Sequence, residues 1–406
     1  MSDAVPAVDR PLDPGSLAQR SGIDADELQR LVSLGIVGRR DDGSFREGDV
    51  TAVRLALALA SSGIPVGDVG AAVGRGELPP LDTVLLLEPI GLLPQTYGEI
   101  ADDLGLEPAG VRGMMEALGL PDVELDAPVR EDDAELLRVA AAVASTGLPE
   151  DTVLRTLRIF AEHLDRMAEH QRGLFRRDVQ DRMLASGMSR AEMLRASAPV
   201  RQFLVGISFR TSHLIHRRLL ERHAFENTAE QFEILLDEIG VRRRPERDPA
   251  AIVFVDLSGY TRLTEEEGDE RAADRGTELA QVVRTATGRH AGRVVKLLGD
   301  GAMIRFERTD DAVTAAIEIV DAVDDSSLPP AHVGIAAGPL IRRDGDYFGR
   351  TVNLAARICD AATAGSVLAS REVADLTQDR AWTDVGEVEL RGVPQPVAIV
   401  ELTRTT

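Results

Sequence analysis

The spacing of apolar residues changes character once along this 406-residue chain, at the segment VRRRPERDPA. Before this segment, apolar residues recur at helical spacing almost throughout. After it, short runs rich in Val and Ile alternate with amphipathic stretches. Prolines and charges interrupt both patterns at residues 241–250, where we expect a linker. The sequence therefore predicts an α+β chain, with an all-α half at 1–240 and an α/β half at 251–406.

The composition is acidic and nearly free of cysteine. Asp and Glu number 68 against 46 Lys and Arg, which gives a formal net charge of −22. A chain of that sign is repelled by nucleic acid and by anionic membranes, so neither is an expected partner. The single cysteine, Cys359, rules out an internal disulfide and favours a reducing compartment. No apolar run approaches the roughly 20 residues of a membrane span, and the first residues lack a signal-sequence pattern, so we expect a soluble, cytoplasmic protein.

The first half contains an internal repeat, with copies at about residues 15–70 and 98–154. The two copies match residue by residue at an offset of about 84. The matched positions include Arg46 with Arg130, Asp49 with Asp133, Arg54 with Arg138, Gly63 with Gly147, and Pro65 with Pro149. Duplication of one helical module explains this pattern.

Each copy has the predicted order of elements of a helix-turn-helix: a helix, a turn with Gly, a second helix, a short link and a further helix. The first copy is similar to the winged helix-turn-helix of MerR-type regulators. DNA binding would need a basic second helix, yet DADELQRLVSLG carries one Arg against three acids. We therefore expect modules that serve packing and signal reception rather than DNA binding.

The segment from 154 to 240 is predicted to be helical and is rich in Arg and His. Three of its histidines, His213, His216 and His223, are spaced to share one side of a helix. Two interpretations stay open: they are polar surface residues, or they form a pH sensor. Histidine gains charge near pH 6, which suits the second interpretation. The part from Leu214 to Gly240 leads into the linker, which makes it a candidate element for transmitting a signal.

The second half opens with a strand that ends in a carboxylate. In IVFVDLSGYTRL, residues 252–263, an apolar run delivers Asp256, and Leu257 to Thr261 turn the chain into a predicted helix. A carboxylate at a strand end followed by a helix N-terminus suits a metal-bound triphosphate. The carboxylate holds Mg²⁺ while the backbone amides bind phosphate oxygens.

A second acid lies at the bend of a predicted hairpin, GRVVKLLGDGAMIRF, residues 292–306. Gly299, Asp300 and Gly301 form this bend. The same residue types are common in hairpin turns that bind no metal. Placed beside the first strand, Asp300 would complete a two-carboxylate site for two divalent cations.

The third segment, HVGIAAGPLIRRDGDYFGRTVNLAARICDAA, predicts a strand, a short arm, and a helix beginning near Gly349. Asn353 and Arg357 lie four residues apart on one face of that helix. An amide and a guanidinium side by side suit ribose positioning and charge stabilisation on a phosphoryl group, although a structural salt bridge would also explain Arg357. Further on, Arg391 precedes a Gly turn and a closing strand.

In this order, FVDLSGYTRL, KLLGDG, DYFGRTVNLAARI and LRGVPQPV resemble the catalytic domain of class III adenylyl cyclases, across residues 250–406. The resemblance implies a ferredoxin-like α/β fold and the conversion of ATP to cyclic AMP and pyrophosphate. The family's site residues fall on matching positions: the metal-binding pair on Asp256 and Asp300, the adenine-reading pair on Lys296 and Asp346, the ribose-orienting Asn on Asn353, and the transition-state Arg on Arg357.

The resemblance also implies two Mg²⁺ or Mn²⁺ ions per active site, bound with help from the backbone carbonyl of Leu257. Arg391 matches a phosphate-binding Lys of the family and keeps its charge but not its geometry. The turn after Asp256 is implied to contact the substrate through Ser258, Gly259, Tyr260 and Thr261.

In this family, one site is shared between two chains, which implies a homodimer with two equivalent sites. One chain supplies the metal ligands, and the other supplies the adenine contacts, Asn353 and Arg357. Independent support for ATP comes from the base itself. Adenine offers an acceptor at N1 and a donor at N6, which complement Lys296 and Asp346, whereas guanine reverses the pattern.

The N-terminal half resembles the helical domain of cyclases that are inhibited at neutral pH, so we expect it to control activity, with pH or a regulatory ligand as the signal. The alternative from another class is a DNA-binding regulator whose cyclase-like domain senses a nucleotide. A diguanylate cyclase is disfavoured because its Gly-Gly-acidic signature is absent from residues 292–306.

Overall fold

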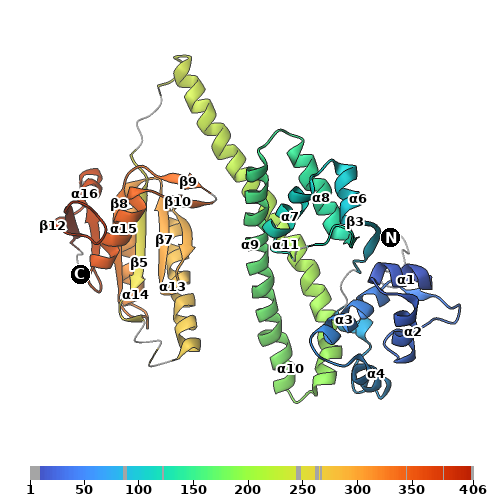
Figure 1. The fold of residues 1–406 in the computed structure, drawn as a ribbon. Coiled ribbons are helices and arrows are strands. Elements are labelled where there is room, and N and C mark those ends of the chain that lie inside the picture. The colour runs from blue at the N-terminus through green and yellow to red at the C-terminus, as the bar shows by residue number, and fades with distance from the viewer. Residues whose placement is uncertain are drawn as a thin grey trace. The chain divides into compact units, whose positions relative to one another are not determined.

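A computed structural model describes residues 10–85, 89–120, 123–243, 248–260, 265, 268–343, 345–377 and 379–403. The chain forms two compact units, Met1–Ala229 and Glu230–Thr406 (Figure 1). The first unit is rich in helices and the second contains a mixed sheet, which confirms the predicted α+β class. The units divide inside a long helix, while the sequence pattern changes at 241–250, so the exact domain limits stay a prediction. No helix in the described ranges is long and apolar enough to cross a membrane.

The first unit contains two modules that share the order strand, helix, helix, strand, helix, and the first module adds two short helices. The first comprises β1 Pro11–Leu12, α1 Pro14–Ser21, α2 Ala25–Ser33, β2 Phe45–Arg46, α3 Asp49–Ser61, α4 Val66–Gly74 and α5 Leu81–Leu85. The second comprises β3 Leu92–Thr96, α6 Tyr97–Leu104, α7 Pro108–Ala117, β4 Pro128–Arg130 and α8 Glu131–Ala144. Each module buries its own apolar core. Each also has a two-stranded antiparallel ladder, β1 with β2 and β3 with β4, whose strands are too short for an alternating pattern to predict.

The starts of the module helices follow from side chains that satisfy exposed backbone N–H groups. Asp13 accepts hydrogen bonds from the N–H groups of Gly15 and Ser16 at the start of α1. Thr96 and Glu99 form a capping box at the start of α6. Such caps contribute about 1 kcal/mol each and fix where a helix begins.

Four further helical segments complete the first unit and cross into the second. They are α9 Glu150–Leu174, the π-helical turn η2 Phe175–Asp181, α10 Arg182–Ala185 and α11 Arg190–Glu238. The predicted helical stretch from 154 to 240 is therefore largely helical. Its last part is one continuous helix of 49 residues.

A pair of buried carboxylates marks equivalent places in the two modules. Asp49, the first residue of α3, and Asp133, in the first turn of α8, are 4% and 5% exposed. Asp133 accepts a hydrogen bond from the Tyr97 hydroxyl at 2.5 Å, whereas Asp49 accepts one from the backbone N–H of Arg46 at 2.7 Å. Burial raises the pKa of Asp49 to about 6, and the charge of Asp82 adds to this effect.

We expect Asp49→Asn to stabilise the chain at pH 7 and not at pH 4. The raised pKa means that the folded state binds the proton more tightly than the unfolded state, so ionised Asp49 opposes folding above about pH 6. The variant should gain about 2–3 kcal/mol at pH 7, and the gain should vanish as the pH falls below about 4. Urea unfolding across this range measures it. Asp132→Asn is a control of opposite sign, because the Arg130 side chain lowers the pKa of Asp132. A gain from Asp49→Asn that did not change with pH would contradict the assignment.

The second unit is built on a seven-stranded sheet in the order β12-β13-β11-β8-β5-β7-β6. Its elements are β5 Ala251–Leu257, α13 Asp269–Arg289, β6 Arg293–Leu297, β7 Gly301–Phe306, α14 Thr309–Asp324, β8 Ala331–Ala337, β9 Ile341–Arg343, β10 Asp346–Phe348, α15 Arg350–Ala361, β11 Val367–Ser370, α16 Arg371–Leu376, β12 Trp382–Val388 and β13 Val397–Leu402. The first four strands alternate with two helices as β5-α13-β6-β7-α14-β8 and lie in the order β8-β5-β7-β6. This is the ferredoxin-like arrangement that was predicted.

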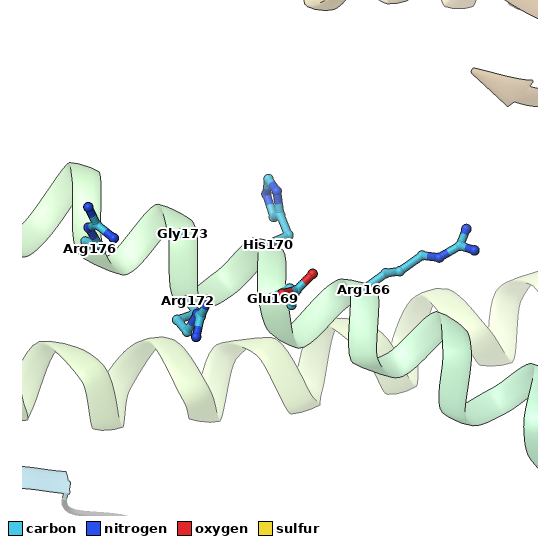
Figure 2. Close-up of a pocket in the computed structure, with 6 residues that line it drawn as sticks. All are labelled: Arg166, Glu169, His170, Arg172, Gly173 and Arg176. Carbon is cyan, nitrogen blue, oxygen red and sulfur yellow. The ribbon is translucent and has the colours of Figure 1, made fainter. Parts of the chain in front are cut away.

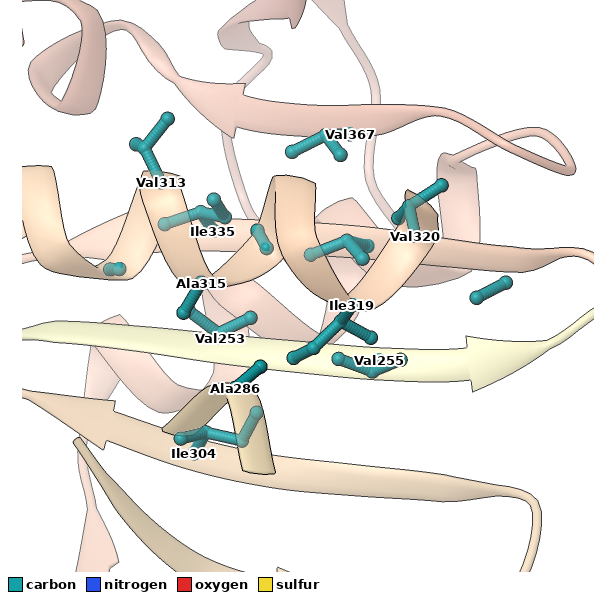
Figure 3. Packing of buried hydrophobic residues seen from close by; sticks show 14 of the residues in the cluster. Val253, Val255, Ala286, Ile304, Val313, Ala315, Ile319, Val320, Ile335 and Val367 are labelled. Carbon is teal, nitrogen blue, oxygen red and sulfur yellow. The ribbon is translucent and has the colours of Figure 1, made fainter. Parts of the chain in front are cut away.

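The central strand β5 is buried on both faces because helices cover both sides of the sheet. Val253 and Val255 pack against α13 and α14, and Figure 3 shows Ile319 of α14 lying over them. Ile252, on the opposite face, packs in a second core with α15. The strand therefore reads as a continuous apolar run up to its last polar residue, Asp256.

Candidate active site

The end of β5 and the β6–β7 turn hold two carboxylates next to each other. Asp256 is paired with Gly301 of β7, and the N–H of Leu257 donates to the carbonyl of Asp300 at 3.0 Å. Gly301 is required at this crossing, because a Cβ there would lie 2.7 Å from the Val255 carbonyl oxygen and 3.0 Å from Oδ1 of Asp256. The structure thus brings Asp256 and Asp300 together.

The electrostatics of this pair favour a bound cation. Burial, followed by the charges of Asp300 and Asp360, raises the pKa of Asp256 to about 6. Within the described residues, no Lys or Arg pairs with Asp256 or Asp300. Carboxylate oxygens with the nearby carbonyl of Leu257 form a hard donor set that suits Mg²⁺ or Mn²⁺. The described residues hold no group of three or more metal-ligating His, Cys, Asp or Glu side chains, so these two carboxylates form a pair rather than a cage.

One neighbour of Asp256 was not found by sequence reasoning. His332, which faces Asp256 across the β5–β8 ladder, places its Nε2 3.6 Å from Oδ2 of Asp256. Its Nδ1 lies 3.1 Å from the Ser258 hydroxyl oxygen. Burial lowers the pKa of His332 below its ordinary value, while the charge of Asp360 opposes the shift. The imidazole is therefore neutral at pH 7 and leaves the carboxylate charge available. Only the strand register reveals this contact.

The turn after β5 contains the predicted substrate contacts. Gly259 has a φ of 77°, a left-handed conformation that favours glycine, and Ser258 and Tyr260 flank it. The Tyr260 hydroxyl donates to the carbonyl of Ala272 in α13, which fastens the turn to that helix. Thr261 lies outside the described residues, as does most of the stretch up to α13.

The predicted base-reading pair is formed within the chain. Nζ of Lys296, in β6, lies 2.7 Å from Oδ2 of Asp346, the first residue of β10. Both side chains are partly exposed, at 42% and 30%. Partial burial opposes the shift, but the Lys296 ammonium and the Tyr347 N–H together lower the pKa of Asp346. Lys296 is the only lysine of the sequence, and the other 45 of the 46 basic residues are arginine.

Helix α15 carries Asn353 and Arg357 one turn apart, and a glycine determines how closely it lies on the sheet. A Cβ on Gly334 of β8 would lie 2.1 Å from the backbone nitrogen of Cys359, so only glycine allows this contact. Asn353 is exposed, and Nη1 of Arg357 lies 2.7 Å from Oδ2 of Asp360. Arg391 is exposed in the turn before β13.

Among the described residues, no hydrogen bond or ion pair joins these side chains to the carboxylate pair, although the charge of Asp360, the partner of Arg357, helps to raise the pKa of Asp256. Asp256 with Asp300, and Lys296 with Asp346, are thus two pairs that are not bonded to each other.

The three histidines of the regulatory prediction lie on α11 in separate surroundings. His216 contacts the ring of Phe160 edge-on, with centroids 6.4 Å apart. Nδ1 of His223 lies 3.0 Å from Oε2 of Glu226, and His213 is exposed. Their regulatory role stays a prediction.

A shallow depression of about 440 Å³ lies elsewhere, against α9 and the start of η2 (Figure 2). It is lined by Arg166, Glu169, His170, Arg172, Gly173 and Arg176. Because one stretch of helix supplies every lining residue, it is a surface hollow unconnected with the carboxylate pair.

Comparison with known proteins decides the family of the second unit. Residues 243–402 match the model of the adenylate and guanylate cyclase catalytic domain. Residues 243–402 are a class III cyclase domain.

A Mycobacterium tuberculosis protein named only as uncharacterized is 28% identical over 386 residues, covering 93% of this chain and 95% of its own length. A protein of the same species named pH-sensitive adenylate cyclase is 26% identical over 316 residues, covering 75% and 77%. Among solved structures, the adenylyl cyclase CyaB of Pseudomonas aeruginosa is similar to the cyclase domain, with 25% identity and a TM-score of 0.36 over 40% of this chain and 96% of that chain.

Proposed function

We propose that this chain is an adenylyl cyclase, which converts ATP to 3′,5′-cyclic AMP and pyrophosphate. The Lys296–Asp346 pair carries the choice of ATP. Its ammonium can donate to adenine N1, and its carboxylate can accept from the N6 amino group, whereas guanine presents the reverse pattern. A chain that otherwise uses arginine as its basic side chain has lysine at this one position. The name of the pH-sensitive relative agrees with this proposal.

The carboxylates Asp256 and Asp300 and the carbonyl of Leu257 would hold two Mg²⁺ or Mn²⁺ ions. Bound there, the ions would lower the pKa of the ribose 3′-hydroxyl and neutralise phosphate charge. The backbone N–H groups of Gly259 and Tyr260, just after β5, would bind phosphate oxygens, whereas the N–H of Ser258 donates to the carbonyl of Pro330 at 2.9 Å.

The remaining roles belong to exposed polar side chains of the cyclase domain. Asn353 would orient the ribose, and Arg357 would stabilise charge on the α-phosphoryl group as the 3′-oxygen bonds to phosphorus. The bond from that phosphorus to the leaving oxygen breaks, and pyrophosphate departs toward Arg391. In this role Arg357 exchanges its contact with Asp360 for the substrate.

We further propose that the active site is shared between two copies of the chain. One copy would supply Asp256 and Asp300, and the other would supply the Lys296–Asp346 pair, Asn353 and Arg357. In support of the proposal, no hydrogen bond or ion pair among the described residues joins Lys296 or Asp346 to Asp256 or Asp300. A two-fold homodimer then contains two equivalent sites.

Control of this site is proposed to come from the N-terminal half, residues 1–240, acting on the cyclase domain, residues 251–406, through α11 and the linker 241–250. Proton binding at the histidines of α11 is the proposed signal, because the pH-sensitive relative is similar over most of its length.

The single cysteine of the chain supports a cytoplasmic location. The DNA-binding alternative is less favoured, because the second helix of the first module, in DADELQRLVSLG, carries one Arg against three acids.

We expect Lys296→Arg to lower kcat/KM for ATP at least about tenfold, although the charge is kept, because a planar guanidinium cannot replace an ammonium as a point donor. Cyclic AMP formation and the ATP-to-GTP preference are measured together. Arg308→Lys, the same exchange in reverse at an exposed position with no proposed role in the site, should stay within about threefold of the wild type. Equal losses in both variants, or an unchanged preference in Lys296→Arg, would contradict base reading by Lys296.

A further inference from the structure

A one-residue bulge in β6 decides on which face of the sheet Lys296 lies. Val294 pairs with Ile304 of β7. Two positions further on, Lys296 pairs with Met303, so Val295 is an extra residue in the strand. Ile304 belongs to the core on one face of the sheet and Met303 to the core on the other. Side chains alternate between the two faces, so without the bulge Lys296 would lie on the face of Ile304. The bulge places it on the face of Met303.

The other half of the base-reading pair, Asp346, lies on an arm outside the seven-stranded sheet. In this arm, β9 and β10 form a two-stranded ladder of their own. Of the arm residues that the structure describes, 341–343 and 345–348, Tyr347 alone is buried, with 5% of its surface exposed. It packs in the same core as Met303. Tyr347 therefore anchors the arm to the face of the sheet on which Lys296 lies.

The two oxygens of the Asp346 carboxylate have different partners. The backbone N–H of Tyr347 donates to Oδ1 at 2.8 Å, and Nζ of Lys296 lies 2.7 Å from Oδ2. Because Asp346 and Tyr347 are consecutive residues of β10, a shift of the Tyr347 ring in its core moves the carboxylate as well. The geometry of the base-reading pair thus depends on what holds this ring.

Arg305 of β7 contacts the Tyr347 ring. It follows Met303 by two residues, so it lies on the same face of the sheet. Its Cζ lies 5.1 Å from the centroid of the Tyr347 ring, which is the range of a cation–π contact. The Arg305 side chain is 21% exposed, and Nη2 lies 2.7 Å from Oε1 of Glu307. Its Nε, however, is buried with no hydrogen-bond partner among the described residues. The aromatic ring therefore compensates a partly desolvated guanidinium, the setting in which a cation–π contact is strongest.

We propose that Arg305 is a positioning residue for base selection. It holds the Tyr347 ring, and the ring keeps Asp346 in the place beside Lys296 that selects adenine over guanine. Arg305 acts through Tyr347 and does not itself bind the nucleotide. The inference rests on the proposed function, because it takes the Lys296–Asp346 pair as the group that reads the base.

Arg305→Met tests this role, because methionine keeps an unbranched apolar side chain and removes the charge. The ratio of kcat/KM for ATP to kcat/KM for GTP should fall at least about fivefold, mainly through a higher KM for ATP, with kcat within about threefold of the wild type. A loss of folded protein lowers both rates equally and leaves this ratio unchanged, so the ratio separates positioning from a structural effect.

Arg293→Met is the matched control. Arg293 pairs with Arg305 across β6 and β7, so both side chains lie on one face, but among the described residues Arg293 contacts no aromatic ring. The ratio should stay within about twofold of the wild type, because the charge is lost without loss of the ring contact.

The ring itself offers an independent pair of variants. Tyr347→Phe keeps an aromatic face for Arg305 and should keep the ratio within about twofold, whereas Tyr347→Leu should lower it about as much as Arg305→Met. Both disruptive changes break the same contact. The double variant Arg305→Met/Tyr347→Leu should therefore lose no more than the more damaging of the two single changes. For a variant with too little turnover, the ratio of dissociation constants for non-hydrolysable ATP and GTP analogues replaces the kinetic ratio.

Equal ratios for Arg305→Met and Arg293→Met, or losses that multiply in the double variant, would overturn the inference. A wild-type chain with no preference for ATP would contradict the proposed function, and this inference with it. A wild-type chain that prefers ATP, beside an Arg305→Met variant with the same preference, would overturn the positioning role alone.

Discussion

Asp300→Ala is expected to lower cyclic AMP production from ATP by at least about 10³-fold, because it removes half of the carboxylate pair that is proposed to hold both cations. Asp256→Ala should have the same effect. The loss should come without unfolding. Asp300 raises the pKa of Asp256, so these like charges repel each other in the absence of a cation, and removing one relieves the repulsion. Cyclic AMP yield with Mg²⁺ or Mn²⁺ and the melting temperature are measured on the same samples.

A suitable control is Asp325→Ala, which removes an exposed carboxylate at the end of α14. We expect it to keep the wild-type rate. If Asp300→Ala retained more than about a tenth of that rate at saturating metal, the two-carboxylate site would be wrong.

Mixing two inactive chains, Asp256→Ala and Arg357→Ala, is expected to restore activity. In the heterodimer, one site combines the intact carboxylates of the second chain with the intact arginine of the first, while the other site carries both defects. Random pairing makes about half of the dimers mixed, each with one good site, so the mixture should reach about a quarter of the wild-type rate.

The matched control mixes Asp256→Ala with Asp300→Ala. Each change damages the carboxylate pair that its own chain supplies, so neither site of the heterodimer is intact and no recovery is expected. Recovery in this control, or no recovery in the first mixture when mass-labelled chains show that heterodimers have formed, would contradict a shared site.

The sequence predicted those features of the site that follow from local pattern. An apolar run ending in Asp256, a Gly-Asp-Gly bend at Asp300, and helical spacing of Asn353 and Arg357 each need only neighbouring residues, and the structure has each in the predicted type of element. The closeness of Asp256 to Asp300 and the Lys296–Asp346 contact came from the family resemblance, because they join elements that are distant in the sequence.

Features that depend on tertiary register could not be predicted. His332 reaches Asp256 only because β5 and β8 pair in one register. The burial that raises the pKa of Asp49 depends on how α3 packs in its module, since the matched Asp133 has a tyrosine hydroxyl instead. The face on which Lys296 lies depends on a bulge in β6, which the alternation of side chains alone does not predict.

The most direct test of the proposed function is turnover of ATP and GTP by the full chain with Mg²⁺ or Mn²⁺, with product identified by mass spectrometry. The proposal predicts 3′,5′-cyclic AMP and pyrophosphate in equal amounts, a clear preference for ATP, and loss of product when EDTA removes the metal. A folded chain that forms no cyclic AMP with either metal across pH 5.5 to 8, or that prefers GTP, would contradict it.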